Sequence, residues 1–312
     1  MVYLVTGGAG FIGSNIAEEL VKKGEKVRVL DNLSTGSKDN LKTFFSDIEF
    51  FEGDIRDEAA LEKALKGIDF VIHEAALRAV QRSVDDPLST NDVNITGTLK
   101  LLIQAKAAGV KRLVFASSSS VYGDNPILPK REDQIPAPVS PYATSKITGE
   151  YYLRVFHKTF GLETVSLRYF NVFGPRQSPK SKYAAVIPLF IDWAKKGEAL
   201  QIHGDGKQSR DFTYIANVVD GTIRACTSEG AAGEVFNMAC GENYSVLDVA
   251  EEIGKVLGIQ IKYDFQPPRP GDVRQTMADP SKAKKILGFK PRVSFKEGIR
   301  RTIEYFDEKT NY

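Results

Sequence analysis

The sequence predicts an α/β protein with a doubly wound parallel sheet, followed by a smaller C-terminal α/β domain that binds the substrate. Short β-branched runs alternate with stretches of helical periodicity over the first half of the chain. A glycine-rich turn directly follows the first of these runs. The 312 residues also exceed the length at which a single core usually stops growing. We therefore expect one domain at residues 1–171 and a second mainly at 172–312, from which some segments return to the first sheet.

The expected elements alternate in the order strand, helix, strand. Runs of strand length occur at residues 3–6, 26–31, 48–52, 70–73, 112–117 and 163–168. Apolar residues three and four apart, typical of helices, occupy the stretches 11–23, 59–65, 91–108 and 142–160. After residue 171, loops with Gly and Pro become frequent, and we expect helices at 187–196, 216–227, 246–257 and 295–308.

Composition excludes several classes of protein. The formal net charge is only +2, so the chain lacks the basic footprint of a nucleic-acid-binding protein. No stretch approaches the roughly eighteen apolar residues of a membrane span, and the first residues do not resemble a signal peptide. Cys226 and Cys240 lack metal-ligand spacing. We expect a cytoplasmic protein with no metal ion and no membrane or nucleic-acid partner.

The glycine-rich turn predicts a dinucleotide site. Gly7, Gly10 and Gly13 lie between the first expected strand and the first expected helix. Glycine has no Cβ to block a tight turn or the approach of a diphosphate to the helix N-terminus, where free N–H groups favour an anion. The spacing is GxxGxxG rather than GxGxxG. A glycine-rich turn without function is the alternative, but the strand-turn-helix context favours a dinucleotide.

Acidic residues after the next two strands refine this prediction. Asp31 ends the second strand, where a carboxylate can accept hydrogen bonds from a ribose diol. Its negative charge would repel a 2′-phosphate, and Asn32 rather than an arginine follows it, so we expect NAD rather than NADP. Asp54 follows the third strand and has two interpretations that remain open: an acceptor for the adenine amine or a helix cap.

Tyr142 and Lys146 are candidates for proton transfer. They lie four residues apart on an expected helix and therefore share one face. Lowering a phenol pKa from about 10 to near 7 takes about 4 kcal/mol of anion stabilisation, part of which a neighbouring ammonium supplies. The serines at 117–120 end the preceding strand, so both elements can meet at the carboxyl edge of the sheet. A polar strand end capped by hydroxyls is the alternative for the serines.

These segments resemble a known family. The chain is similar to the extended short-chain dehydrogenase/reductase superfamily, which has a Rossmann fold, and within it to the UDP-hexose 4-epimerases. The matching signatures are Thr6-Gly7-Gly8-Ala9-Gly10-Phe11-Ile12-Gly13, His73-Glu74-Ala75-Ala76, Ser117-Ser118-Ser119-Ser120-Val121-Tyr122-Gly123, Tyr142-Ala143-Thr144-Ser145-Lys146, Arg168-Tyr169-Phe170-Asn171, Arg210-Asp211-Phe212 and Arg269-Pro270-Gly271-Asp272.

The resemblance implies a mechanism. Tyr142 takes the proton of the sugar 4-hydroxyl while C4 gives a hydride to tightly bound NAD, and Ser118 hydrogen-bonds the reacting oxygen. The 4-keto intermediate turns over and regains the hydride on its other face. Lys146 binds the nicotinamide ribose and tunes Tyr142. Ser119 and Ser120 either assist proton transfer or are structural.

The resemblance also completes the two expected binding sites. The cofactor site comprises Gly7, Gly10, Phe11, Ile12, Gly13, Asp31, Asn32, Asp54, Ile55, Ala75 and Lys146. The substrate site comprises Ser118, Ser119, Tyr142, Asn171, Arg210, Arg269, Thr276 and Arg82. Arg210 and Arg269 are expected at the diphosphate, with solvated surface arginines as the alternative. Arg82 is expected to reach the sugar.

Two departures from related enzymes narrow the expected reaction. Sugar-nucleotide dehydratases of the superfamily carry an Asp-Glu pair where this chain has Ser119 and Ser120, so dehydration is disfavoured. Related epimerases place a bulky Tyr against the hexose where this chain has Thr276, which leaves room for an N-acetyl group.

We therefore expect a UDP-hexose 4-epimerase that acts on UDP-Glc/UDP-Gal and UDP-GlcNAc/UDP-GalNAc. A UDP-glucuronate decarboxylase or 4-epimerase is the alternative; it needs a cation for the sugar carboxylate, for which Arg82 and Arg176 are candidates. A non-catalytic NAD-binding sensor or scaffold is the alternative from another class. The helices at 91–108 and 142–160 resemble those of the family's dimer interface, so we expect a homodimer.

Overall fold

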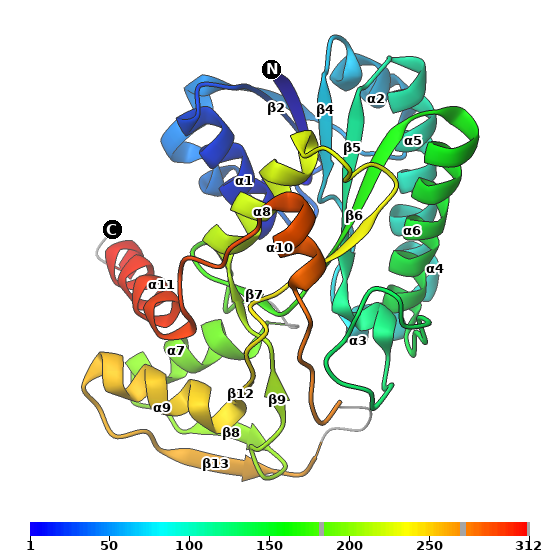
Figure 1. Ribbon diagram of the computed structural model, residues 1–312. Coiled ribbons are helices and arrows are strands. Elements are labelled where there is room, and N and C mark those ends of the chain that lie inside the picture. Colours follow the sequence, from blue (N-terminus) through cyan, green and yellow to red (C-terminus); the bar gives the residue numbers. More distant parts are fainter. Residues whose placement is uncertain (181–183, 269–272, 311–312) are drawn as a thin grey trace.

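The computed structural model describes residues 1–180, 184–268 and 273–310, and it centres on a seven-stranded sheet. All neighbouring strands in this sheet are parallel (Figure 1). Their order is β3 (Ile48–Glu52), β2 (Lys26–Asp31), β1 (Val2–Thr6), β4 (Phe70–His73), β5 (Arg112–Ser118), β6 (Glu163–Tyr169) and β11 (Val235–Met238). The six strands expected in the first half of the chain are all present, within one residue of the expected ends.

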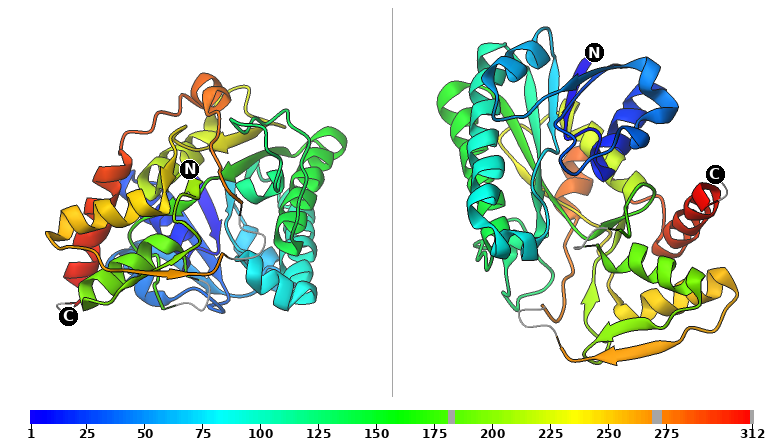
Figure 2. Two further views of the ribbon diagram at one scale, coloured as in Figure 1. Left: turned by 90° about the horizontal axis from the view of Figure 1, so that it is seen from below. Right: turned by 180° about the vertical axis from the view of Figure 1, so that it is seen from behind.

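Helices cover both faces of the sheet, as Figures 1 and 2 show, and this confirms the doubly wound α/β fold. One face packs against α1 (Phe11–Lys22) and α8 (Ile215–Thr227). The other packs against α2 (Glu58–Leu65), α5 (Thr98–Ala107) and α6 (Pro141–Phe160). Consecutive strand residues enter opposite cores: Val5 lies in the core with α1, and Leu4 in the core with α5. Alternation of side chains along a strand buried on both faces explains the continuous apolar runs.

The expected helix at 91–108 is more complex than its periodicity predicts. It is built from α4 (Pro87–Asn91), a π-helical turn at Asp92–Gly97, and α5. The short helix α3 (Val80–Asp85) precedes it. Three 3₁₀ turns, at Lys38–Asn40, Lys42–Asp47 and Ser119–Tyr122, were not expected either.

The second half of the chain forms the helices that the periodicity predicts. These are α7 (Val186–Lys196), α8, α9 (Val246–Leu257) and α11 (Phe295–Thr310), to which the structure adds α10 (Ser281–Leu287). Three small two-stranded sheets accompany them: β8 (Leu200–His203) with β13 (Tyr263–Gln266), β9 (Ser209–Arg210) with β12 (Tyr244–Ser245), and β7 (Val172–Phe173) with β10 (Thr213–Tyr214). Strand β11 instead pairs with β6 of the main sheet. The domain boundary after residue 171 stays a prediction.

Within the described part of the chain, no helix combines the length and apolar character needed to cross a bilayer.

A buried ion pair ties α6 to the sheet. Arg168 of β6 donates from Nη2 to Glu150 Oε2 of α6 at 2.7 Å and from Nε to Oε1 at 2.9 Å. Each side chain is only 3% exposed. The Ser117 hydroxyl at the end of β5 also donates to Glu150, and the Arg168 guanidinium lies 4.7 Å from the centroid of the Tyr122 ring. One carboxylate therefore fixes the helix against the ends of two adjacent strands.

Replacing Glu150 with Gln should lower the free energy of unfolding by about 3 kcal/mol, because Arg168 would remain buried without its counter-charge. Urea unfolding measures this change. The matched control is Asp133→Asn, which breaks an exposed pair with Arg131 and should cost at most about 0.5 kcal/mol. Equal effects of the two substitutions would show that the buried pair does not stabilise the fold.

Candidate active site

A cavity of about 890 Å³ lies at the carboxyl ends of the parallel strands, where doubly wound sheets bind their ligands. Nearly all of the predicted site residues line it. They are Gly7, Gly10, Phe11, Ile12, Gly13, Asp31, Asn32, Asp54, Ile55, Ala75, Ser118, Ser119, Tyr142, Lys146, Asn171, Arg210 and Thr276. The structure thus brings together residues predicted from segments that lie far apart in the chain.

The predicted arginines are distributed differently. Arg82 lines an adjoining cavity of about 370 Å³, together with Arg78 and Lys180. Arg269 lies outside the described residues. Arg176, a candidate cation for a sugar carboxylate, donates to Glu18 at 2.8 Å and its side chain is 9% exposed. Arg176 lines neither cavity, so of the two candidates only Arg82 lies next to the site.

The glycine turn is shaped to admit a ligand backbone. Gly7 has a φ of +68°, and a Cβ on it would lie 2.6 Å from the backbone nitrogen of Ala75. A Cβ on Gly13 would lie 2.4 Å from the Gly7 carbonyl oxygen. Helix α1 begins at Phe11 without a side-chain cap on its first N–H groups. These N–H groups remain open to an anion, so the turn fits the diphosphate of a dinucleotide.

Asp31 lies at this end of the cavity, where two backbone N–H groups hold its carboxylate. Asp31 is 7% exposed and accepts hydrogen bonds from the backbone N–H groups of Ala9 (2.9 Å) and Leu33 (2.8 Å). A carboxylate has about four acceptor positions, so it retains capacity for a ribose. Burial raises the pKa of Asp31, and these two hydrogen bonds oppose the rise.

The helix-cap interpretation of Asp54 is wrong. Asp57 caps α2 by accepting from Ala59 and Ala60. Asp54 instead accepts from the guanidinium of Arg56 at 2.8 and 2.9 Å and from Asn32 at 2.7 Å. The Arg56 hydrogen bonds lower the pKa of Asp54 to about 2, so Asp54 is ionised at neutral pH.

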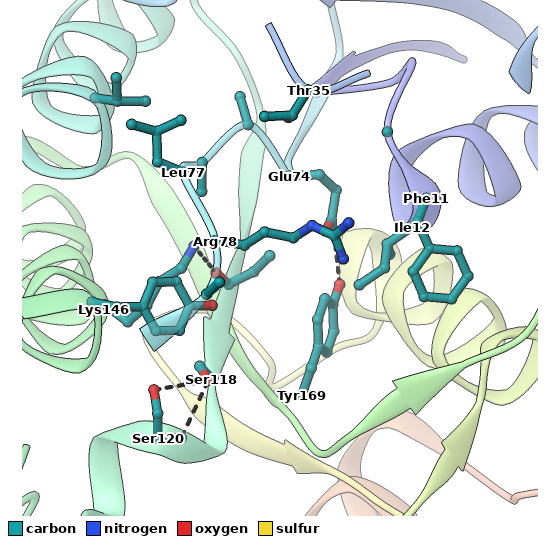
Figure 3. Close-up of a pocket in the computed structure, with 18 of the residues that line it drawn as sticks. Phe11, Ile12, Thr35, Glu74, Leu77, Arg78, Ser118, Ser120, Lys146 and Tyr169 are labelled. Atoms are coloured by element: carbon teal, nitrogen blue, oxygen red, sulfur yellow. Dashed lines mark hydrogen bonds between the residues drawn. The ribbon is translucent and has the colours of Figure 1, made fainter. Parts of the chain in front are cut away.

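Helix α6 brings Tyr142 and Lys146 to the other end of the cavity. Ser140 caps this helix by accepting from the Ala143 N–H at 3.1 Å. Lys146 Nζ donates to the Ala116 carbonyl oxygen at 2.8 Å, as Figure 3 shows, and lies 5.8 Å from the centroid of the Tyr142 ring. The Ser118 hydroxyl lies near the Tyr142 phenol and opposes the rise in its pKa. The predicted catalytic trio thus meets where α6 passes the end of β5.

Burial and several neighbouring side chains act on the pKa of Tyr142. Burial raises the pKa of Tyr142, the Ser118 hydroxyl and the charge of Arg78 oppose this rise, and the charge of Glu74 adds to it. Burial lowers the pKa of Lys146 to about 8. The expected effect of Lys146 on the pKa of Tyr142 stays a prediction, and Arg78 is a further cation, not considered in the sequence analysis, whose charge opposes the rise.

The serines cap a turn and also line the cavity, so their structural function is observed and their part in proton transfer stays a prediction. The Ser118 hydroxyl oxygen accepts from Ser120 Oγ at 2.9 Å and from the Ser120 N–H at 3.2 Å, which caps the 3₁₀ turn at Ser119–Tyr122. Ser118, Ser119 and Ser120 all line the cavity as well. A structural hydrogen bond therefore does not remove Ser118 from the site.

The substrate end joins segments from the second half of the chain. Thr276 donates its backbone N–H to the Ser209 carbonyl at 3.1 Å, which places Thr276 beside Arg210. Asn171 Nδ2 donates to the Asp211 carbonyl at 3.1 Å. The Asp211 side chain is fully buried and accepts from the N–H groups of Cys240, Gly241 and Ala278. This carboxylate therefore joins the loop of Arg210 to the loop of Thr276.

Among the lining residues that sequence analysis did not assign to the site are Glu74, Arg78 and Tyr169. Figure 3 shows the side chains of Glu74 and Arg78 in the cavity, on the chain that follows β4. Their position after a parallel strand was the available signal, because such positions face the ligand crevice. Glu74 and Tyr169 also lie within the quoted signatures His73-Glu74-Ala75-Ala76 and Arg168-Tyr169-Phe170-Asn171.

Comparisons with known proteins agree with this architecture. Residues 4–302 match the family model described as GDP-mannose 4,6 dehydratase. A UDP-glucuronate 4-epimerase of Thermodesulfobacterium geofontis is 38% identical, covering 98% of this chain and 96% of that protein.

Two solved structures are also similar over nearly the whole chain. The first is a UDP-N-acetylglucosamine 4-epimerase of Methanobrevibacter ruminantium, in complex with UDP-N-acetylmuramic acid. It is 42% identical, with a TM-score of 0.94 and 98% coverage of both chains. The second is a UDP-glucose 4-epimerase of Thermus thermophilus, in complex with NAD. It is 38% identical, with a TM-score of 0.90, covering 98% of this chain and 99% of that one. The chain therefore belongs to the extended short-chain dehydrogenase/reductase superfamily and, within it, to the family of UDP-hexose 4-epimerases.

Proposed function

We propose that this protein is an NAD-dependent UDP-hexose 4-epimerase that interconverts UDP-Glc with UDP-Gal and UDP-GlcNAc with UDP-GalNAc. One observation carries the proposal. A single cavity has the glycine turn and Asp31 at one end, and Ser118, Tyr142 and Lys146 at the other. A dinucleotide that lies along the strand ends would place its redox ring beside a hydroxyl, a phenol and an ammonium.

The first end holds the cofactor. The N–H groups that begin α1 bind the diphosphate, and Asp31 binds the adenosine ribose through its remaining acceptor positions. The charge of Asp54 is balanced by Arg56, so it is the carboxylate of Asp31 that disfavours a 2′-phosphate and favours NAD. NAD, when bound, accepts and returns the hydride at C4 of the sugar.

The residues of the chain move the proton. Tyr142 takes the proton of the sugar 4-hydroxyl and returns it after the sugar has turned over, while Ser118 hydrogen-bonds the same oxygen. Burial opposes the ionisation of Tyr142, so nearby positive charge is needed. Arg78 supplies some of that charge, and Lys146, with a pKa of about 8, is still mostly protonated at pH 7.

The substrate end holds the UDP-sugar. Arg210 and Arg269 bind its diphosphate together with Asn171, while Ser119 faces the sugar and Arg82 approaches it from the adjoining cavity. Thr276 is small enough to leave space for an N-acetyl group. The 42% identity to a UDP-N-acetylglucosamine 4-epimerase supports this range of substrates.

A UDP-glucuronate decarboxylase or 4-epimerase is a second candidate. Arg78, Arg82 and Lys180 place three cationic side chains around a cavity that adjoins the catalytic one, and cations of this kind can bind a sugar carboxylate. The 38% identity to a UDP-glucuronate 4-epimerase supports it. A non-catalytic sensor would have no need for Tyr142, Lys146 and Ser118 in one cavity.

The protein is also proposed to be a cytoplasmic homodimer. Helices α5 and α6 expose apolar side chains that include Ile103 (50%), Tyr151 (55%) and Val155 (46%). Burial of such side chains between two copies would stabilise a dimer. Multi-angle light scattering should give twice the mass of the chain. A monomer mass at micromolar concentration would contradict the dimer.

Incubation of the purified protein with UDP-Glc, UDP-GlcNAc and UDP-GlcA in separate reactions tests the proposed function. NMR of the products should show UDP-Gal and UDP-GalNAc, and Tyr142→Phe should reduce both rates by at least about 100-fold without loss of folding. A decarboxylated product from UDP-GlcA alone would favour the second candidate. No conversion of any UDP-sugar despite bound NAD would leave only the sensor.

The substitution Thr276→Tyr tests the size of the sugar pocket. A larger side chain should reduce turnover of UDP-GlcNAc by at least about tenfold and leave turnover of UDP-Glc nearly unchanged, because only the N-acetyl group needs the space. Steady-state kinetics with each substrate measure both rates, and Thr276→Val, which keeps the volume, is the control. An equal loss with both substrates in a folded protein would rule out Thr276 as the size filter.

A further inference from the structure

Glu74 is an ionisable side chain of the catalytic cavity that the proposed proton transfer does not use. It directly follows β4, and its backbone N–H donates to the Thr6 carbonyl oxygen at 3.1 Å. This bond continues the pairing of β4 with β1 beyond the strand ends. The next residue, Ala75, packs so closely against Gly7 that a Cβ on Gly7 would lie 2.6 Å from its nitrogen. The backbone of Glu74 is thus fixed against the glycine turn.

The side chain of Glu74 is fixed as well. The Tyr169 hydroxyl donates to Glu74 Oε1 at 2.7 Å, as Figure 3 shows. That hydroxyl also lies 2.9 Å from the Thr222 hydroxyl of α8. Tyr169 is 7% exposed and Thr222 is fully buried. A carboxylate held by buried partners keeps its position when a ligand enters, so its charge acts without a cost of reorganisation.

Glu74 interacts with three titratable side chains, and each interaction changes the pKa of Glu74 or of its partner. They are Tyr169 of β6, and Lys146 and Tyr142 of α6. Burial raises the pKa of Glu74 to about 7, while the Tyr169 hydrogen bond and the Lys146 charge oppose the rise. Burial lowers the pKa of Lys146, and the charge of Glu74 opposes that change. Glu74 therefore interacts electrostatically with the catalytic end of the cavity.

The order of the strands places Glu74 at the redox half of the cofactor site. Asp31 marks the adenosine end at β2, and Ser118 marks the catalytic end at β5. The strands lie in the order β2, β1, β4, β5, β6. The backbone of Glu74 lies at the end of β4, and its side chain contacts Tyr169 at the end of β6. The carboxylate therefore lies across the strand ends on the catalytic side. An oxidised nicotinamide ring is positively charged, whereas a reduced one is neutral.

We propose that Glu74 makes the cavity bind oxidised NAD more tightly than NADH, an inference that rests on the proposed use of NAD. An ionised carboxylate attracts the positive ring and has no comparable attraction for the neutral one. The same preference favours return of the hydride to the 4-keto sugar, because the cofactor regains its positive charge in that step. Glu74 is a positioning residue in this sense: it sets the balance between the two cofactor states and takes no proton from the sugar.

Cofactor binding to the stripped protein tests the inference without turnover. Calorimetric titration at pH 8.5 gives the ratio of Kd for NADH to Kd for NAD. Glu74→Gln should lower this ratio by at least about fivefold, because Gln keeps the size and an acceptor for Tyr169 but loses the charge. Glu52→Gln, in an exposed pair with Lys38, is the matched control and should leave the ratio unchanged.

Two further measurements separate charge from packing. Tyr169→Phe removes the hydrogen bond but keeps the carboxylate, so it should retain most of the preference for NAD at pH 8.5. In the wild type, the preference should fade as the pH falls through about 7, because Glu74 then becomes neutral. The charge of Glu74 also raises the pKa of Lys146, so Lys146→Met, which removes that titration, is compared with the wild type over the same pH range.

The possible failures are distinct. An equal ratio in the wild type and Glu74→Gln, with both cofactors bound, would overturn the inference and leave the proposed function intact. A loss of preference in Tyr169→Phe as large as in Glu74→Gln, which persisted when the pH was raised further to keep Glu74 ionised, would also overturn it, because charge would not be the cause. If neither cofactor binds to the wild type, the proposed function fails together with the inference.

Discussion

The buried ion pair between Glu150 and Arg168 is the interaction on which the geometry of the site depends. Tyr142, Lys146 and Glu150 follow one another at intervals of four residues along α6 and therefore share one face of this helix. Glu150 fixes that face to β6 through Arg168 and to β5 through Ser117. The phenol and the ammonium are thereby aligned with the strand end that carries Ser118. The same ion pair therefore holds the catalytic side chains in position and stabilises the fold.

Charge in the cavity is arranged along the strand ends. At one end Asp31 provides a carboxylate that suits a ribose and disfavours an additional phosphate, while Arg56 balances the charge of Asp54. The catalytic side places Lys146 and Arg78 near Tyr142 and also holds the carboxylate of Glu74. Burial makes each ionisation costly, so the activity of Tyr142 depends on the balance of these neighbours and of the cofactor. We infer that the charged side chains of the cavity control the ionisation of Tyr142 in addition to binding ligands.

Much of the fold could be predicted because its signals are local. Strands β1 to β6 are short runs rich in β-branched, leucine and aromatic residues, and α1 and α6 have clear periodicity with a glycine turn or Ser140-Pro141 at their starts. Strand β11 has only four residues, and its pairing with β6 comes from tertiary structure. The two-residue strands β9 and β12 are too short to have a periodicity.

The residues of the site divide in the same way: some belong to local sequence patterns, and others come together only in the folded structure. The glycine turn, Asp31 and the Tyr142–Lys146 spacing are local patterns, and their residues line one cavity. The contact of Glu74 with Tyr169 joins positions 95 residues apart, and the hydrogen bond of Lys146 to Ala116 joins positions 30 apart. Spacing along the chain cannot reveal such contacts. For this reason sequence analysis missed Arg78, whose charge opposes the rise in the pKa of Tyr142.

The central claim is that the phenol, the ammonium and the Ser118 hydroxyl surround the reacting carbon of a sugar beside the cofactor ring. A crystal structure of the protein with NAD and a UDP-hexose tests this most directly. The account predicts that the Tyr142 hydroxyl lies within about 3 Å of the sugar O4, with C4 facing the nicotinamide. A sugar bound elsewhere, or a Tyr142 that remains distant from both the sugar and the ring, would contradict it.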